Sequence, residues 1–149
     1  MITFADSSAL VALYADEPGH GSGSALENPL VSQLARVEVP SAIWRKHRMG
    51  ELSATDARTL VDAFEADYFG ADDEPPRFLV VALTSAVLDD AARMTAAHGL
   101  RAYDAVQLAS ACAARSAGAG SPAFAAIDRA LCSAAAAEGF AVLPAVHGG

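Results

Sequence analysis

The chain opens with Met1-Ile2-Thr3-Phe4-Ala5-Asp6-Ser7-Ser8-Ala9-Leu10, a short apolar run that ends abruptly in one carboxylate. This pattern predicts a buried strand over residues 2–5 and a helix that starts just after Asp6, with Ser7 or Ser8 as its cap. Open α/β sheets build their sites beyond the carboxyl ends of their strands. An acid at this position is therefore well placed for chemistry, provided that other acids converge on it.

The composition indicates a single domain, over residues 1–149, with one core, since 53% of the 149 residues are hydrophobic. No stretch reaches the roughly 18 apolar residues of a membrane helix. No basic segment precedes an apolar run, as it would in a secretory signal. Cys112 and Cys132 lie in Ala-rich stretches, which favours reduced thiols over a disulfide. We therefore expect a cytoplasmic protein with no membrane partner.

The formal net charge of −8 argues against a nonspecific nucleic-acid binder, because such proteins are usually basic. It does not exclude a metal-dependent nuclease, whose acids are offset locally by cations.

Strands and helices alternate along the rest of the chain. Further strands are predicted over residues 30–32, 78–83, 123–127 and 140–143, and the uniformly apolar run 78–83 should be buried on both faces. Helices are predicted over residues 33–49, 57–68, 85–98, 104–112 and 129–138. This order implies an α/β protein of three layers, α/β/α, around a central, mostly parallel sheet of four to five strands.

The predicted helices carry several boundary and packing signals. Ser53 and either Thr84 or Ser85 should cap helix starts, and Gly70 should close a helix. Pro40 should kink the helix over 33–49 just after Glu38, with a fresh helix from Pro40 as the alternative. The apolar faces of two helices are predicted to hold Leu34, Val37, Ile43 and Trp44, and Val87, Leu88, Ala91 and Met94.

Four acids occupy positions that this fold would bring together. Asp6 and Asp128 each follow an apolar strand and precede a helix, so both should emerge at the same edge of a parallel sheet. Glu38 and Asp104 lie in apolar surroundings near the starts of helices. Alone, Asp104 could favour a helix dipole, Asp128 could be a plain N-cap, and Glu38 could pair with a nearby arginine. Together, the four favour a shared site.

Four segments, taken in their order along the chain, resemble the motifs of a known family. They are Phe4-Ala5-Asp6-Ser7-Ser8-Ala9-Leu10, Ser32-Gln33-Leu34-Ala35-Arg36-Val37-Glu38-Val39, Leu100-Arg101-Ala102-Tyr103-Asp104-Ala105-Val106-Gln107-Leu108-Ala109 and Ile127-Asp128-Arg129-Ala130-Leu131. With these, the chain resembles the PIN-domain ribonucleases, specifically the VapC-type toxins of type II toxin–antitoxin pairs. The resemblance spans nearly the whole chain.

The resemblance implies a PIN-like fold and a metal-dependent endoribonuclease. Its metal-binding, catalytic acids fall on Asp6, Glu38, Asp104 and Asp128, with Ser7 as a supporting hydroxyl. It also implies Mg²⁺ or Mn²⁺ as cofactor, RNA as substrate, a cognate antitoxin protein as partner and a homodimer. Carboxylate oxygens suit such hard cations, which activate water and neutralise phosphate charge.

Two departures from the family pattern concern the site. Ala126 stands where the family often has a Ser or Thr, which puts a hydrogen-bonding group near the metal in doubt. The Gly- and Ser-rich residues 19–24 shorten a helix that the family usually has, which could reshape an edge of the cleft.

Basic and aromatic residues near the acids allow more than one interpretation. Arg36 and Arg101 are the preferred candidates for RNA contact because they lie close in sequence to the acids. The run Arg45-Lys46-His47-Arg48 could steer phosphates or simply form a solvated helix face. Trp44 is expected in the core or a dimer interface. His20, His47 and His147 show no zinc-ligand spacing.

Two rival functions remain open. A degenerate PIN module would bind RNA or an antitoxin without cutting, and Ala126 favours it slightly. A phosphoaspartyl phosphotransferase would need Asp-x-Asp after the first strand, but position 8 is Ser8.

Overall fold

The computed structural model describes residues 2–16, 26 and 29–143. Residues 19–24, His20 and His147 lie outside this range, so the shortened segment is not described. The described residues form an α/β fold around a five-stranded parallel sheet, as predicted. The strands are β1 (Thr3–Ala5), β2 (Pro29–Ser32), β3 (Leu79–Val81), β4 (Ala123–Ala125) and β5 (Ala141–Leu143). Their order is β3-β2-β1-β4-β5, so the opening strand is the central one.

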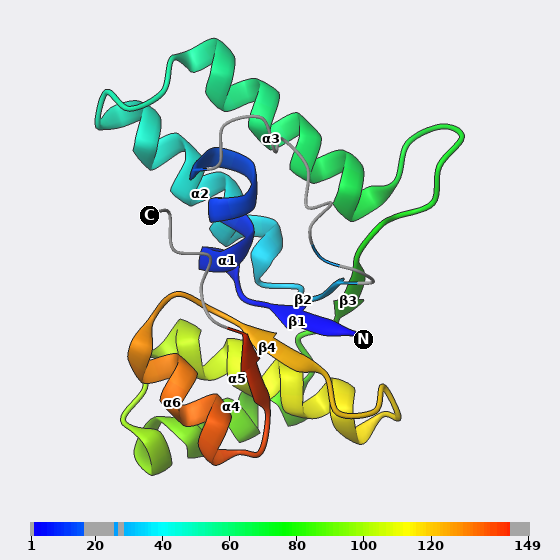
Figure 1. Cartoon of the computed structure of the whole chain (residues 1–149), viewed down its shortest axis with the longest axis vertical. Coiled ribbons are helices and arrows are strands. Elements are labelled where there is room, and N and C mark those ends of the chain that lie inside the picture. Colours follow the sequence, from blue (N-terminus) through cyan, green and yellow to red (C-terminus); the bar gives the residue numbers. More distant parts are fainter. Residues whose placement is uncertain (1, 17–25, 27–28, 144–149) are drawn as a thin grey trace.

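Helices cover both faces of the sheet and complete the three layers (Figure 1). On one face lie α1 (Ser7–Val11), α2 (Ala35–Arg48) and α3 (Ala54–Phe69), and a π-helical turn over Ala12–Asp16 continues α1. On the other lie α4 (Ser85–His98), α5 (Ala102–Ser116) and α6 (Arg129–Ala137). No helix in the described ranges is long and apolar enough to cross a membrane.

Successive side chains of a strand point to opposite faces of the sheet, so the core has two parts, one on each face. Phe4 and Phe124 pack with α4, α5 and α6, and their rings stack at 5.4 Å across paired strands. The next residue of β1, Ala5, faces the other way and packs with α1, α2 and α3. The sheet is therefore buried on both sides at its centre, which holds the carboxyl end of β1 firmly in place.

The prediction of a strand over 78–83 buried on both faces is wrong in length and burial. Only Leu79–Val81 is a strand, and the side chains of Leu79 and Val80 are 56% and 39% exposed. The physical reason is that β3 lies at the sheet edge, with β2 on one side. An apolar run identifies a strand but does not show whether that strand lies at the centre or at the edge of the sheet.

Two predicted core positions are also wrong, since Val37 is 67% exposed and Leu88 is 49% exposed. Helix α2 buries Val39 and Ile43 instead of Val37. Pro40 lies inside a continuous α2, so the alternative of a fresh helix starting there is wrong. Burial of Val39 and Ile43 on both sides of the proline stabilises the helix against the hydrogen bond that proline removes.

The helix boundaries agree with most of the capping predictions. Ser53 and Thr84 accept hydrogen bonds from the backbone amides of Asp56 and Val87. Gly70 ends α3 with a φ of +84°, and a Cβ there would lie 2.8 Å from the Glu74 carbonyl oxygen, so glycine is required. The predicted cap of α1 is wrong, because Asp6 itself caps the helix. Both cysteines are free and partly buried.

Candidate active site

The four predicted acids line one cavity at the carboxyl ends of the strands. Its volume is about 460 Å³, and its lining comprises Asp6, Ser7, Ser8, Glu38, Arg45, Arg101, Asp104, Gln107, Ile127 and Asp128. Strand β1 ends directly before Asp6, and the parallel strand β4 ends at Ala125, shortly before Asp128, which brings both acids to the same sheet edge. Helices α2 and α5 contribute Glu38 and Asp104 from their first turns.

Exposure of the acids increases from the floor of this acidic cavity to its rim. Asp6 is 3% exposed, Glu38 and Asp104 are half-buried, and Asp128 is exposed. The cost of keeping a negative charge therefore differs among the four, and it is largest at Asp6.

Asp6 is both the cap of α1 and a wall of the acidic cavity. Its Oδ1 accepts hydrogen bonds from the Ala9 amide at 2.9 Å and the Ser8 hydroxyl at 2.8 Å. These bonds favour the charged carboxylate, but burial outweighs them, and the negative charges of Asp104 and Glu38 act in the same direction as burial. The pKa of Asp6 is therefore raised from its ordinary value of 3.8 to about 6.

Glu38 is held by two donors on a single oxygen. The Ser7 hydroxyl and the Gln107 side-chain amide each donate to Oε1 at 2.8 Å, and Gln107 Nε2 also donates to Ser7 Oγ at 2.8 Å. The three side chains come from α2, α1 and α5, so this triangle ties both faces of the sheet together at the cavity. It fixes the direction in which the Glu38 carboxylate points.

Gln107 is the functional candidate that sequence reasoning missed. Its side chain is 2% exposed, and its Oε1 is buried without a hydrogen-bond partner among the described residues. The available signal was a glutamine on the mostly apolar buried face of α5, three residues after Asp104 and so on the same side of the helix. A buried amide with one unpaired oxygen is costly, and its place beside Glu38 suggests a role in the site.

Asp104 and Asp128 complete the acidic wall. Partial burial raises the pKa of Asp104, the charges of Asp128 and Glu38 raise it further, and Arg101 opposes the rise. Asp128 caps α6 by accepting the Leu131 amide at 2.9 Å. The interpretation of Asp128 as an N-cap is therefore confirmed. The same carboxylate also lines the acidic cavity.

Ala126 is buried, and the Ser8 hydroxyl, although distant in sequence, lies close in space to the next residue, Ile127. The Ser8 hydroxyl donates to Asp6 and lies 3.4 Å from the Ile127 amide, which points at it. A hydroxyl thus links the ends of β1 and β4 from the α1 side.

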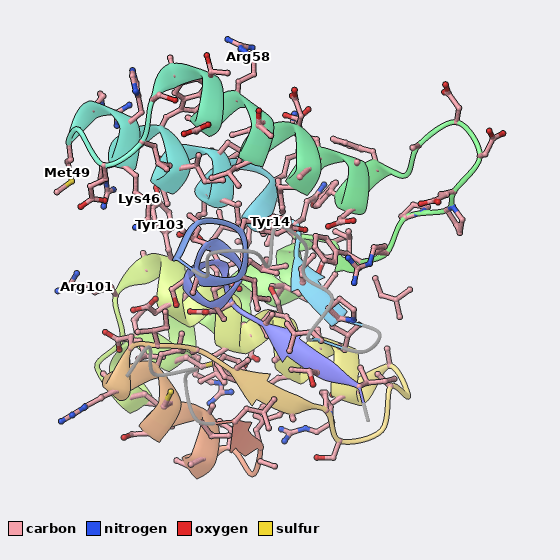
Figure 2. The ribbon with its side chains drawn as sticks, turned by 45° about the horizontal axis from the view of Figure 1, so that its top comes forward. Tyr14, Lys46, Met49, Arg58, Arg101 and Tyr103 are labelled. Atoms are coloured by element: carbon pink, nitrogen blue, oxygen red, sulfur yellow. The ribbon has the colours of Figure 1, made fainter. Side chains whose placement is uncertain are left out.

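The two arginines predicted to touch RNA take different positions. Arg101 precedes α5, extends outward from it (Figure 2) and lines the acidic cavity. Arg36 does not line that cavity; it lies 3.6 Å from Glu65 and 5.1 Å above the Phe69 ring, both on α3. Arg45, from the basic run of α2, lines the cavity instead. Lys46 of the same run lies 3.6 Å from Glu51.

The four acids are the candidate metal ligands of this cavity. In the ranges that the structure describes, no three His, Cys, Asp or Glu side chains form a group that could hold a metal ion as they stand. The acids fit a hard cation in their chemistry, because Mg²⁺ prefers oxygen ligands and binds through one or two carboxylates while keeping several waters. A cavity lined by four acids can therefore hold a Mg²⁺ ion that keeps part of its water shell.

Comparisons with known proteins yield a likeness in fold. No family model matches the chain, and no curated protein matches it. Among solved structures, the "Crystal structure of PAE2754 from Pyrobaculum aerophilum" is similar, with a TM-score of 0.62 and 22% sequence identity. The match covers 95% of this chain and 83% of that one. At this identity the likeness supports the α/β/α architecture alone.

Proposed function

We propose that this chain is a PIN-type endoribonuclease that depends on Mg²⁺ or Mn²⁺ and acts as the toxin of a toxin–antitoxin pair. One observation carries the nuclease proposal: four carboxylates from four separated segments line one cavity at the carboxyl edge of a parallel sheet. Packing alone does not explain a 3% exposed aspartate whose charge is disfavoured by burial and by neighbouring acids.

In the proposed mechanism, Asp6 and Asp104 would hold the cation, and Glu38 and Asp128 would bind it directly or through water. The bound ion would supply charge neutralisation for the phosphate and an acidified water. Ser7 and Gln107 orient Glu38 by donating hydrogen bonds to its Oε1. We therefore assign to the other oxygen, Oε2, the role of accepting a proton from the attacking water. Arg101 and Arg45 line the acidic cavity and would bind the phosphates of the RNA on either side.

The partners follow from the same proposal. An antitoxin with basic side chains would complement the acidic cavity and the net charge of −8. A homodimer belongs to the proposal through the family resemblance only, whereas the proposed cytoplasmic location is supported by the two free cysteines.

The alternative, a PIN-like module that binds without cutting, is favoured by one observation. The acids are not gathered into a three-ligand group in the described residues. A phosphoaspartyl mechanism has less support, because position 8 holds a serine whose hydroxyl donates to Asp6.

The test is incubation of purified protein with mixed cellular RNA, with Mg²⁺ and with excess chelator, followed by mapping of the fragment ends. We expect internal cuts with Mg²⁺ only. Asp89→Asn, on the exposed surface of α4, is the control for loss of an acid away from the cavity. Cleavage that continues unchanged in chelator would contradict metal dependence, and binding without any cleavage would support the alternative.

A further inference from the structure

A second cavity adjoins the acidic one and differs from it in chemistry. Its volume is about 530 Å³, and its walls include the apolar side chains of Val11, Leu34, Val37, Tyr103 and Ile127. The two cavities share Ser7, Ser8, Glu38, Arg45 and Ile127, so they form one continuous depression with an acidic part and an apolar part.

Exposed apolar side chains gather at this apolar cavity. Tyr103 is 64% exposed, Val37 is 67% exposed and Ile127 is 48% exposed. They come from α5, α2 and the connection between β4 and α6, which are distant in sequence. Folding of the chain itself leaves these apolar surfaces in water, and such a patch beside a functional cavity is typical of a binding surface.

Cations stand where the apolar cavity meets the acidic one. Arg45 lines both, and Lys46 lines the apolar cavity together with Tyr103, on the side of the molecule that also carries Arg101 (Figure 2). Tyr103 also directly precedes Asp104, so an aromatic ring and a carboxylate of the site are adjacent in the first turn of α5. The depression thus offers an apolar floor, a cationic border and an acidic end.

We propose that the apolar cavity is a subsite for one unpaired base of the RNA strand, with the Tyr103 ring as its stacking surface. This rests on the proposed ribonuclease function and deepens it by naming where one base of the RNA strand binds. A base is flat and apolar on its faces, whereas its phosphate is anionic, which matches an aromatic wall bordered by Arg45. Single-stranded RNA is recognised in this way, by stacking of splayed bases on aromatic side chains.

A base suits the cavity better than a protein segment does. A strand of RNA can fill both cavities at once, with its base against Tyr103, its phosphate at Arg45 and the next phosphodiester at the acids. Arg45, which lines both cavities, attracts a phosphate, whereas the basic side chains of an antitoxin would find partners of opposite charge only at the acids. Duplex RNA cannot supply the base without unpairing it, so duplex should bind weakly.

The experiment measures binding in chelator, where metal-dependent cleavage does not interfere. The probe is a short single-stranded RNA with one 2-aminopurine, whose fluorescence falls when the base stacks on an aromatic ring. We expect quenching with wild type and with Tyr103→Phe. For Tyr103→Ala we expect no quenching and an affinity lower by about tenfold, within the range of one stacked base.

Phe69→Ala is the matched control, because Phe69 is another exposed aromatic residue, 56% exposed on α3, that lines neither cavity. Melting curves check that each variant is folded. Equal affinity of Tyr103→Ala and wild type for the single strand would overturn the subsite, and would leave the apolar cavity to a protein segment. Equal affinity for a matched duplex would overturn it as well.

The same RNA and variants, when Mg²⁺ is added, also test the base subsite and the nuclease proposal independently of each other. RNA that quenches in a Tyr103-dependent way but is never cut with Mg²⁺ supports the subsite and contradicts the nuclease. RNA that is cut equally by wild type and Tyr103→Ala supports the nuclease and contradicts the subsite.

Discussion

Gln107 Nε2 lies 2.8 Å from Glu38 Oε1, and through this bond a buried amide on α5 orients a carboxylate on α2. The same nitrogen donates to Ser7 on α1, so a single side chain connects three helices at the cavity. Its Oε1 has no hydrogen-bond partner within residues 2–16, 26 and 29–143, which indicates that Gln107 is not placed there for stability alone.

Gln107→Leu should therefore affect activity more than stability. Leucine fills similar space, removes the unpaired oxygen and leaves Ser7 bonded to Glu38, so we expect a change in unfolding free energy of only about 1 kcal/mol. Cleavage should slow by about 10- to 100-fold, as when a partner that orients a metal ligand is lost. Urea unfolding and single-turnover rates check this, with Asp89→Asn on the exposed surface of α4 as control. An unchanged rate would show that Glu38 needs no positioning by Gln107.

Asp6→Asn should stabilise the metal-free protein at pH 7 while abolishing cleavage. Asparagine caps a helix about as well as aspartate, so the bond to the Ala9 amide can persist. The raised pKa of Asp6, about 6 instead of 3.8, corresponds to about 3 kcal/mol of unfavourable charge burial, which the substitution removes. Melting in chelator measures this, and Asp89→Asn should have little effect. A clearly lower melting temperature for Asp6→Asn would mean that its charge serves the fold.

The pH dependence of the metal-free protein should follow from the same acid. Between pH 3.8 and about 6 the folded state keeps a proton on Asp6 that the unfolded chain has lost. Stability should therefore fall as pH rises through this window and level off above it, with the raised pKa of Asp104 acting in the same direction. Urea unfolding at several pH values in chelator checks this. A wild type that gains stability across the window relative to Asp6→Asn would contradict it.

Arg101 and Arg36 should differ in their effect on RNA binding. Arg101 lines the acidic cavity, whereas Arg36 lies against Glu65 and Phe69 on α3. Arg101→Ala should weaken binding of single-stranded RNA and lower the number of counterions released on binding by about one. Arg36→Ala should leave both the affinity and this number nearly unchanged. Binding titrations at several salt concentrations measure this. Equal losses in both variants would show that RNA extends over α3.

The site could be predicted from sequence to the extent that simple chain geometry positions it. Asp6 and Asp128 follow parallel strands, and such strands end at one sheet edge, so their common cavity was foreseeable. Arg36 lies outside the acidic cavity because nearness in sequence to Glu38 does not determine the side of α2 on which a residue points. Within this helix Val39 turns inward and Val37 outward, although both are apolar neighbours of Glu38.

The bond from Gln107 to Glu38 could not be predicted for a related reason. It depends on how α5 packs against α1 and α2 across the sheet, and no periodicity within α5 contains that information. The exposure of β3 likewise depends on its place at the edge, which follows from the strand order and not from its own residues.

We propose that the four-acid cavity cuts RNA with a bound divalent cation. The most direct measurement is the single-turnover cleavage rate of one single-stranded RNA by wild type and Asp6→Asn, each with Mg²⁺ and with excess chelator. We predict cleavage by wild type with Mg²⁺ and none in the other three combinations, with both proteins folded. Cleavage by Asp6→Asn at the wild-type rate, or by wild type in chelator, would contradict the account.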